Sequence, residues 1–287
     1  MRTRFIPTAF AAALIMAACA TASGPDLSGM SFSDRPLVGK VIWNDLITED
    51  IDAARRFYGG LFGWTFEDTS SPGRENYVLA RSGNIYVAGL VSVATPADGT
   101  GISRWLPYVS VADVDASISR SVSAGATVAA SARNVNLGRV AAIVDAEGAV
   151  IGLARSNIGD PDDRTTAAAA GRVVWTELLS NNPSAAAAFY ESVVGFDTQT
   201  VERRGGTYTL LAGAGVDRAG ILENPSDEWS PVWLTYFGVP DPAAAADRAV
   251  QLGGKVLLPV SPELRESSMA VVSDPSGALL VLQKWSS

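Results

Sequence analysis

Apolar positions along the chain follow two periods, and the order of these periods predicts a repeated unit. The stretch "VIWNDLI" (41–47) alternates and is rich in β-branched residues, as a half-buried strand does. A helix should follow, capped by Asp50 or Asp52. Apolar side chains recur on one face of that helix, at Ile51, Ala54, Phe57, Leu61 and Phe62. Strand-like runs then come near 76–82 and 85–93, which gives the order βαβββ.

The same order restarts in the middle of the first half. A strand at 106–112 precedes a helix over 113–125 that ends at Gly125, and strands follow at 127–133, 139–145 and 149–155. The second half then repeats the first. "VIWNDLITEDIDAARRFYGGLFGW" (41–64) and "VVWTELLSNNPSAAAAFYESVVGF" (173–196) are identical at 8 of 24 positions. Residues 106–128 recur at 234–256, and "DAEGAVIGL" (145–153) recurs as "DPSGALLVL" (274–282), both with an Asp-x-x-Gly turn.

The pattern therefore predicts an α+β protein of four βαβββ units in two pairs. Polar, small-residue stretches divide the chain into a signal peptide (1–18), a flexible tether (19–37), a first domain (38–156), a linker (157–171) and a second domain (172–287). We expect the two pairs to be related by approximate two-fold symmetry. The sequence leaves the oligomeric state open, and a monomer with an internal pseudo-dimer is one alternative.

The first residues indicate export and a lipid anchor. Arg2 and Arg4 precede an apolar run (5–18) that is too short to span a bilayer. The sequence "MAAC" (16–19) resembles the bacterial lipobox, in which the cysteine is lipidated and becomes the mature N-terminus. The resemblance implies that Cys19 anchors the protein to a membrane facing the periplasm or the exterior. The alternative is ordinary export with cleavage near residues 20–22.

Composition excludes several classes of function. Among 287 residues there is no histidine, which removes the commonest general base and the commonest transition-metal ligand. A formal net charge of −8, with no long basic run, argues against nucleic acid as a partner. The single cysteine excludes an intramolecular disulfide.

Three features make the chain similar to a known family. They are the repeated opening that ends in "FYGGLFGW" and "FYESVVGF", the Asp-x-x-Gly hairpins and the number of βαβββ units. It resembles the vicinal oxygen chelate superfamily of glyoxalase, bleomycin-resistance and extradiol-dioxygenase proteins, over about residues 38–285. The resemblance implies that two units form one cup-shaped, eight-stranded mixed sheet, so that the chain has two cups. Metal enzymes of the family place their ligands on the first and last strand of each unit.

The resemblance carries these ligand positions onto residues that cannot bind a metal through their side chains. They are Trp43, Leu106, Trp175 and Leu234 on first strands, and Gly89, Gly152, Gly220 and Val281 on last strands. We therefore expect neither metal nor cofactor in either cup, and glyoxalase or dioxygenase chemistry becomes doubtful. The sequence leaves open whether the chain is an enzyme. The loss of the family's metal-ligand residues favours a protein without enzymatic activity.

Strand alternation selects the other side chains that share the face of each cup. These candidate ligand-binding residues are Trp43, Asp45, Tyr108, Ser110, Trp175, Glu177, Tyr236 and Gln283. Aromatic rings beside one carboxylate and a few neutral polar groups suit a small ligand that is cationic or rich in hydroxyls. The alternative is that the two tryptophans are packing residues, and that the two carboxylates pair with a nearby Arg or Lys or face solvent at the mouth of the cup.

Three functions remain compatible with the sequence. The first is an envelope lipoprotein that binds an unidentified small molecule in one or both cups without a metal. The second is an enzyme of the same fold that uses Asp45 or Glu177 as a general base, with a pKa raised by the neighbouring tryptophan. The third is a structural or interaction protein whose cups are filled.

We expect Cys19→Ala to release the protein from the membrane fraction, because acyl chains on this cysteine would supply the anchor. Immunoblotting of membrane and soluble fractions from the native host measures the outcome. Ser23→Ala is the matched control and should leave the distribution unchanged. If Cys19→Ala fractionates as the parent does, the lipobox interpretation is wrong.

Overall fold

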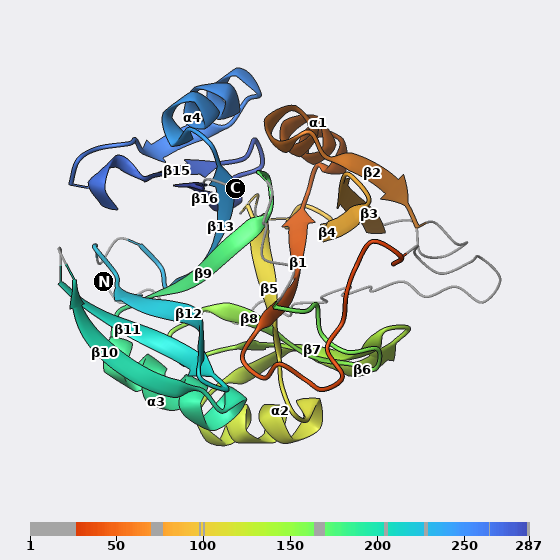
Figure 1. Ribbon diagram of the computed structural model, residues 1–287, viewed down its shortest axis with the longest axis vertical. Coiled ribbons are helices and arrows are strands. Elements are labelled where there is room, and N and C mark those ends of the chain that lie inside the picture. The colour runs from red at the N-terminus through yellow and green to blue at the C-terminus, as the bar shows by residue number, and fades with distance from the viewer. Residues whose placement is uncertain are drawn as a thin grey trace.

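Two eight-stranded mixed sheets with four helices form the protein in the computed structural model (Figure 1). It describes residues 27–69, 77–97, 99, 101–163, 170–203, 206–226, 229–263 and 265–285. The first sheet has the order β2-β3-β4-β1-β5-β8-β7-β6 and the second the order β10-β11-β12-β9-β13-β16-β15-β14. The expected α+β class and the pairing of βαβββ units are thereby confirmed.

The elements of the first half are β1 (Val41–Thr48), α1 (Ile51–Phe62), β2 (Thr65–Asp68), β3 (Tyr77–Ser82), β4 (Ile85–Ser92), β5 (Arg104–Ser110), α2 (Val114–Ser123), β6 (Thr127–Val135), β7 (Gly138–Val144) and β8 (Val150–Ser156). Those of the second half are β9 (Val173–Ser180), α3 (Pro183–Val194), β10 (Asp197–Arg203), β11 (Gly206–Gly213), β12 (Val216–Glu223), β13 (Val232–Val239), α4 (Pro242–Gln251), β14 (Lys255–Leu258), the short helix η1 (Arg265–Ser267), β15 (Met269–Ser273) and β16 (Leu279–Lys284).

Two units join at the centre of each sheet through their first strands. β1 and β5 run antiparallel, with Trp43 opposite Tyr108 and Asp45 opposite Leu106. β9 and β13 repeat this arrangement, with Trp175 opposite Tyr236 and Glu177 opposite Leu234. The last strand of each unit pairs in parallel with its first, as β4 does with β1. The first and last strands therefore lie at the middle of each sheet, where their side chains can converge.

Helix starts follow the sequence closely. Asp50 caps α1 by accepting from the backbone N–H of Ala53, at 2.8 Å, whereas Asp52 lies inside the first turn. Asn182 caps α3 in the same way, through the N–H of Ala185. Both helices end at a glycine with positive φ, Gly63 at 70° and Gly195 at 91°. The repeated "FYxxxxG" sequence thus sets the last turns and the end of each helix.

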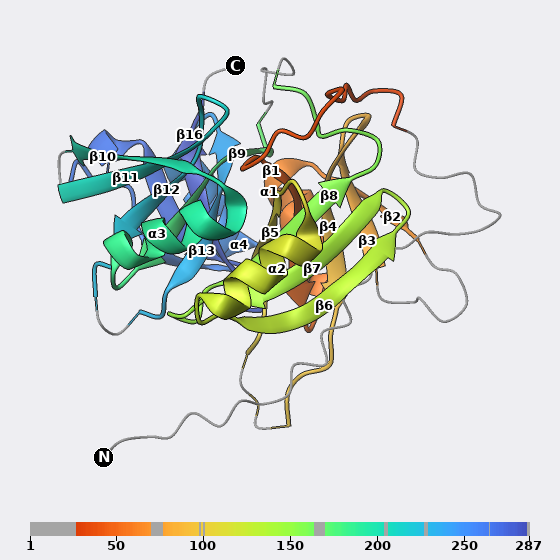
Figure 2. The ribbon, with the colours of Figure 1, turned by 90° about the horizontal axis from the view of Figure 1, so that it is seen from below.

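The helices lie in two pairs at the junction of the domains, on either side of the contact between β5 and β13, and each helix-side core belongs to both domains. One core joins α1 to residues of β13, α4, β15 and β16, with Phe62 stacked on Phe237 at 5.1 Å between ring centroids. The other joins α2 and β5–β8 to α3 and β11–β13. Figure 1 shows α1 beside α4, and Figure 2 shows α2 beside α3 on the opposite side. Each domain therefore buries apolar surface of the other, which stabilises the pair.

Two buried tyrosines make matching hydrogen bonds across this junction. Tyr190 Oη donates to Asp145 Oδ2 at 2.8 Å and accepts from Trp233 Nε1 at 2.9 Å. Tyr58 Oη donates to Asp274 Oδ2 at 3.2 Å in the same manner. Each tyrosine comes from a "FY" pair and each aspartate from an Asp-x-x-Gly turn of the other domain. Such reciprocal contacts are the mark of an approximate two-fold relation.

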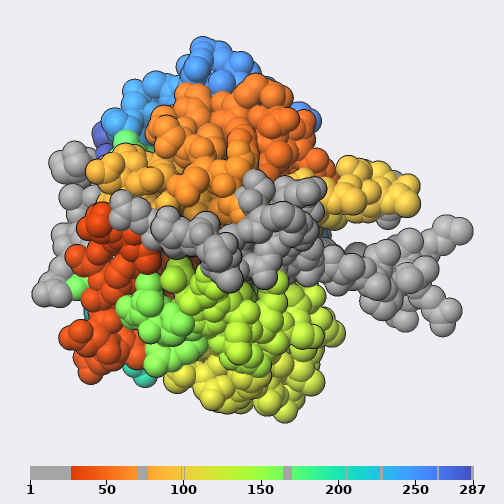
Figure 3. All heavy atoms as spheres, turned by 90° about the vertical axis from the view of Figure 1, so that its right-hand side faces the viewer, coloured from red at the N-terminus to blue at the C-terminus, as the bar shows by residue number. Residues whose placement is uncertain are grey.

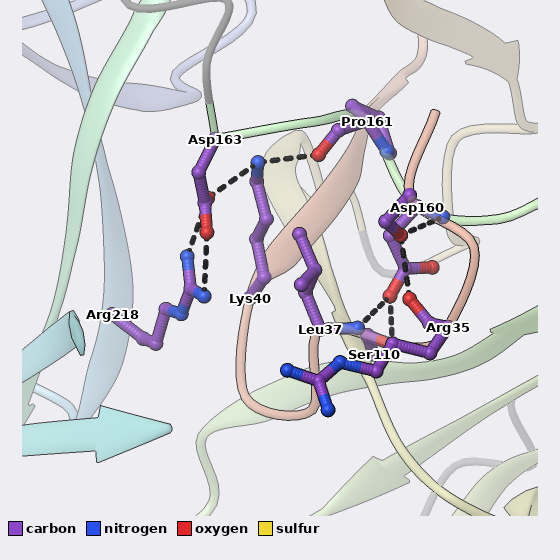
Figure 4. A network of polar contacts seen from close by, with 9 residues as sticks. Arg35, Leu37, Lys40, Ser110, Asp160, Pro161, Asp163 and Arg218 are labelled. Carbon is purple, nitrogen blue, oxygen red and sulfur yellow. Dashed lines mark hydrogen bonds and ion pairs between the residues drawn. The ribbon is translucent and has the colours of Figure 1, made fainter. Parts of the chain in front are cut away.

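The segment before β1 packs against the segment after β8 (Figure 4). The Asp160 carboxylate accepts from the Ser110 hydroxyl and from the Leu37 backbone N–H, each at 2.6 Å. Asp163 forms an ion pair with Lys40 at 2.9 Å and with Arg218 of β12 at 2.6 Å. On the surface, the red N-terminal segment lies beside green residues of the chain after β8 (Figure 3). Residues 27–37, part of the stretch expected to be a flexible tether, are thus hydrogen-bonded to the expected linker.

The signal peptide and Cys19 lie outside the described residues. Across the ranges that the structure describes, every helix is too short or too polar to cross a bilayer. Strand β2 was not located from the sequence, because four residues are too few for alternation to be distinctive.

Tyr190→Phe should lower the free energy of unfolding by about 1–3 kcal/mol, because Asp145 and Trp233 would each lose a buried partner. Urea unfolding monitored by circular dichroism measures this change. Tyr86→Phe is the control: its hydroxyl donates to Glu67, whose side chain is 49% exposed and can turn to water. Equal losses for the two variants would contradict a special role of the interdomain bond.

Candidate functional site

A carboxylate lies on the helix-free face of the first sheet, in what we call cup one. Asp45 of β1 is 0% exposed, and its Oδ1 accepts from Trp43 Nε1 at 2.8 Å and from Tyr77 Oη of β3 at 2.9 Å. The strand period puts Trp43 and Asp45 on the same face, and the short distance shows that the indole turns toward the carboxylate. Around them lies an apolar surface that includes Ile47 and Leu106.

The other oxygen of this carboxylate has unused hydrogen-bonding capacity. Asp45 Oδ2 and Tyr108 Oη are both buried, and neither makes a hydrogen bond of normal geometry within the described chain. Yet Tyr108 lies close enough to Asp45 to lower the pKa of the carboxyl. The two groups thus act on each other's pKa as a hydrogen-bonding pair, at a geometry that falls short of a normal hydrogen bond. Buried polar groups in this state are uncommon, and they call for a partner such as water or a ligand.

Burial dominates the electrostatics of cup one. It raises the pKa of Asp45 from 3.8 to about 6, although hydrogen bonds from Tyr77, Trp43 and Tyr108 and the positive charge of Arg133 lower it. Burial also raises the pKa of Tyr77 and Tyr108 well above 10.0, with the Asp45 charge adding to the effect. Asp45 therefore changes its protonation near neutral pH, while both tyrosines stay protonated.

Glycines on the last strands make room for the tyrosines. A Cβ on Gly89 would collide with Tyr77 Oη and Asp45 Oδ1, and one on Gly152 would collide with the Tyr108 ring. Gly220 bears the same relation to Tyr208 in the second sheet. A side chain at any of these three positions is incompatible with the tyrosine as placed. The tyrosine rings thus occupy the space that last-strand side chains would otherwise fill.

The second sheet repeats this cluster with a different charge balance, in what we call cup two. Glu177 of β9 is 0% exposed, and its Oε1 accepts from Tyr208 Oη at 2.6 Å and from Trp175 Nε1 at 3.1 Å. Tyr236 Oη donates to Oε2, and the Arg265 guanidinium donates to Oε1. Both carboxylate oxygens of Glu177 therefore have partners.

Arg265 reaches Glu177 from η1 and lies against two tyrosine rings. Its guanidinium carbon is 5.3 Å from the centroid of the Tyr236 ring and 5.9 Å from that of Tyr208. Although burial lowers the pKa of Arg265, contacts with Tyr236 and Glu177 raise it above its ordinary value. Cup two thus contains a carboxylate paired with a fixed cation, one of the alternatives that the sequence left open.

The structure gathers six of the eight candidate residues into the two clusters. Ser110 lies elsewhere, where its hydroxyl donates to Asp160. Gln283 donates to the Ser268 carbonyl oxygen at 3.0 Å and so fixes the chain after η1. Both share strand parity with cluster residues, but both lie nearer the strand end.

Sequence reasoning missed Tyr77, Tyr208 and Arg265. The two tyrosines were detectable, because they recur 131 residues apart at the start of corresponding strands, close to the offset of the opening repeat. Arg265 also had a signal, because Arg133 lies 132 residues before it, at the offset of the opening repeat. Its hydrogen bond to Glu177 from the segment after β14 still depends on the tertiary fold.

The donors of the two clusters are poorly suited to a metal ion. In the part of the chain that the structure describes, no three His, Cys, Asp or Glu side chains gather at one place. Each cup offers one carboxylate, surrounded by hydroxyl and indole hydrogens that donate to it. Tyrosine hydroxyls with raised pKa values stay protonated and are weak ligands. The arrangement can instead hold a small polar group or transfer a proton at Asp45.

Comparisons with known proteins agree with this architecture. The family model described as "Glyoxalase/Bleomycin resistance protein/Dioxygenase superfamily" matches residues 172–282, and that of a "Glyoxalase-like domain" matches residues 42–153. The chain is 34% identical over 247 residues to "Putative glyoxylase CFP32" of Mycobacterium tuberculosis, covering 84% of this chain and 93% of the relative. It is 31% identical over 231 residues to "Anthracycline biosynthesis protein DnrV" of Streptomyces peucetius, covering 76% and 83%.

Solved structures show the same fold at much lower identity. A Mn(II)-bound glyoxalase from Novosphingobium aromaticivorans superposes with a TM-score of 0.57 at 16% identity, covering 86% of this chain and 82% of that one. The 2,2',3-trihydroxybiphenyl 1,2-dioxygenase of Sphingomonas wittichii superposes with a TM-score of 0.57 at 13% identity, covering 86% and 91%. These two likenesses concern the fold alone.

Asp45→Asn should remove a pH-dependent part of the stability. Because the native carboxyl has a pKa of about 6 against 3.8 when solvated, the native state binds the proton more tightly than the unfolded chain. The parent therefore loses stability as the pH rises from about 4 to above 6, by roughly 2–3 kcal/mol. The stability of Asp45→Asn minus that of the parent should rise by this amount, as measured by urea unfolding at each pH.

Asp163→Asn is the control for this titration. Hydrogen bonding from Arg218, together with Lys40, lowers the pKa of Asp163 to about 2. The stability that Asp163 contributes is present above about pH 4 and is lost as the pH falls toward 2, so its difference from the parent should stay flat between pH 4 and 7. If the stability difference between Asp45→Asn and the parent is also independent of pH, burial does not raise the pKa of Asp45.

Proposed function

Because the chain belongs to the glyoxalase/bleomycin resistance protein/dioxygenase superfamily, we propose that it binds a small molecule in cup one without a metal. The observation that carries this proposal is the pair of buried atoms Asp45 Oδ2 and Tyr108 Oη, which have no hydrogen-bond partner of normal geometry in the described chain. In cup two the corresponding carboxylate is fully bonded, so cup one is the better binding site.

The ligand that fits these two atoms carries a hydroxyl group. A hydroxyl donates one hydrogen bond and accepts others, so it can donate to Asp45 Oδ2 while accepting from Tyr108 Oη. Apolar residues around the pair, among them Trp43 and Leu106, favour a hydrophobic or aromatic body on the ligand. The name of the 31% identical Streptomyces relatives, "Anthracycline biosynthesis protein", supports a class of hydroxylated aromatic molecules.

Absence of a metal is part of the proposal and rests on the donor set. The positions that correspond to metal ligands by resemblance hold Trp, Leu, Gly or Val. Gly89, Gly152 and Gly220 also lie in contact with tyrosine side chains, so a larger residue at any of these positions would displace the tyrosine. One carboxylate that already accepts two hydrogen bonds is a poor substitute for a ligand set.

A second candidate function is proton transfer by Asp45. A general acid or base works best when its pKa lies near the working pH, and burial raises the pKa of Asp45 to about 6. With a hydroxyl or an acidic C–H of the ligand at Oδ2, Asp45 could exchange a proton while Tyr108 donates a hydrogen bond to the neighbouring oxygen. Turnover of a bound ligand that Asp45→Asn abolishes would favour this function over binding alone.

We further propose that the mature protein is a lipoprotein anchored through Cys19 and facing the periplasm or the exterior. The supporting observations are those of the sequence: two arginines, a short apolar run and "MAAC" before residue 20. Cup one would then meet ligands outside the cytoplasm.

The experiment is a thermal-shift screen of hydroxylated aromatic compounds, followed by titration of any hit by calorimetry. Asp45→Asn should weaken binding about tenfold to a hundredfold, because losing a charged hydrogen bond costs about 1.5–3 kcal/mol. Trp43→Ala should have a similar effect through lost burial. Elemental analysis of the same sample should find no stoichiometric transition metal.

Glu177→Gln and Trp175→Ala make the same changes in cup two and serve as matched controls. They should leave the affinity within about twofold of the parent, well below a 1.4 kcal/mol change. Equal effects in both cups would place binding in both. Unchanged binding in all four variants, provided that they stay folded, would mean that the clusters are packing residues.

A further inference from the structure

The Arg265 guanidinium occupies a site that has the composition of a cation-binding site. Glu177 supplies a buried carboxylate, and the rings of Tyr208 and Tyr236 lie within 5.9 Å of the guanidinium carbon. Carboxylates and aromatic faces are the groups with which proteins bind alkylated cations. The cation that fills the site belongs to the protein itself.

The segment that delivers Arg265 is conformationally strained. Arg265, Glu266 and Ser267 have φ values of 47°, 56° and 62°, the left-handed region that residues with a Cβ seldom adopt in succession. Outside this segment, Ala214 is the one described non-glycine residue with positive φ. A strained conformation persists when its contacts compensate for it, and the contact of Arg265 with Glu177 is the buried one here.

The first sheet builds the corresponding region differently. There β6 continues over Thr127–Val135 and turns directly into β7, whereas β14 stops at Leu258 and ten residues lead to Met269. Pro259 and Pro262 explain the early end of β14, because proline cannot donate to the ladder. The left-handed segment around Arg265 is therefore particular to the second domain. An arginine near the cup carboxylate is common to both, since the charge of Arg133 in β6 lowers the pKa of Asp45.

The Arg265 side chain is also reachable from solvent, with 31% of its surface exposed, while Glu177 beneath it has none. A cation that arrives from outside can thus meet the guanidinium before it meets the carboxylate.

We propose that cup two is a second binding site, for an alkylguanidinium or similar organic cation, and that Arg265 is an internal occupant which this ligand displaces. The inference is independent of the hydroxyl ligand proposed for cup one. It assigns to Glu177, Tyr208 and Tyr236 the roles of carboxylate and aromatic walls.

Ethylguanidinium is the probe, because it replaces the part of the side chain that Arg265→Ala removes. Calorimetric titration of the full mature chain should show saturable, weak binding to the parent and binding at least about tenfold tighter to Arg265→Ala, which no longer competes. Neutral ethylurea, of the same shape, should not bind. Adding Glu177→Gln to Arg265→Ala should abolish binding of the cation.

Arg265→Lys covers the case in which Arg265→Ala does not fold, because it keeps the charge while losing the planar fork. It should bind ethylguanidinium more tightly than the parent. Arg81→Ala is the matched control, since Arg81 also lies over a tyrosine ring, 4.8 Å from the Tyr86 centroid, and is paired with an exposed glutamate. No saturable binding to the parent, or equal binding of ethylurea, would overturn the proposal and leave Arg265–Glu177 as a permanent ion pair.

Discussion

A buried tyrosine hydroxyl that donates to an aspartate of the other domain is the interaction on which the arrangement of the two sheets depends. It occurs twice, as Tyr190 with Asp145 and Tyr58 with Asp274. Both tyrosines lie on the helix that opens a domain, and both aspartates lie in the hairpin that closes one. Because an unpaired buried carboxylate is costly, either bond fixes the orientation of the two domains as well as their contact. The helices are consequently paired across the domain junction, and the helix-free faces are left for the two carboxylate clusters.

Those two clusters are different solutions to the burial of one negative charge. In cup one neutral groups donate hydrogen bonds to Asp45, the charge of Arg133 acts on it as well, and burial raises the pKa of the carboxyl to about 6. Cup two surrounds Glu177 with the same kinds of donor and adds the Arg265 cation. The Asp45 carboxyl can gain or lose a proton, so it suits a ligand hydroxyl that can either donate or accept a hydrogen bond. An ion pair closed by a strained segment suits exchange of one cation for another. The two cups thus differ in whether a cation donates directly to the buried carboxylate.

The glycines of the last strands connect the fold to these sites. Gly89 and Gly220 face the tyrosine hydroxyls that bind each carboxylate, and any Cβ would displace them. The position that the resemblance assigns to a metal ligand therefore became a space for an aromatic hydroxyl. Each cup keeps one carboxylate. Both proposals therefore have the ligand held by hydrogen bonds to this carboxylate and not by coordination to a metal ion.

The sequence by itself determined the units, the helix ends and the pairing of residues within each half. Alternation, caps and the repeated "FY…G" sequence are local, and so is the two-residue spacing that brought Trp43 to Asp45 and Trp175 to Glu177. It did not reveal that the "FY" pairs and the Asp-x-x-Gly turns bond to each other across the domains. Nor could it show that Ser110 turns to Asp160, or that Arg265 reaches Glu177. These contacts join residues 45 to 216 positions apart. Only the tertiary structure decided them, because burial and charge compensation are properties of the folded chain and not of any short stretch of it.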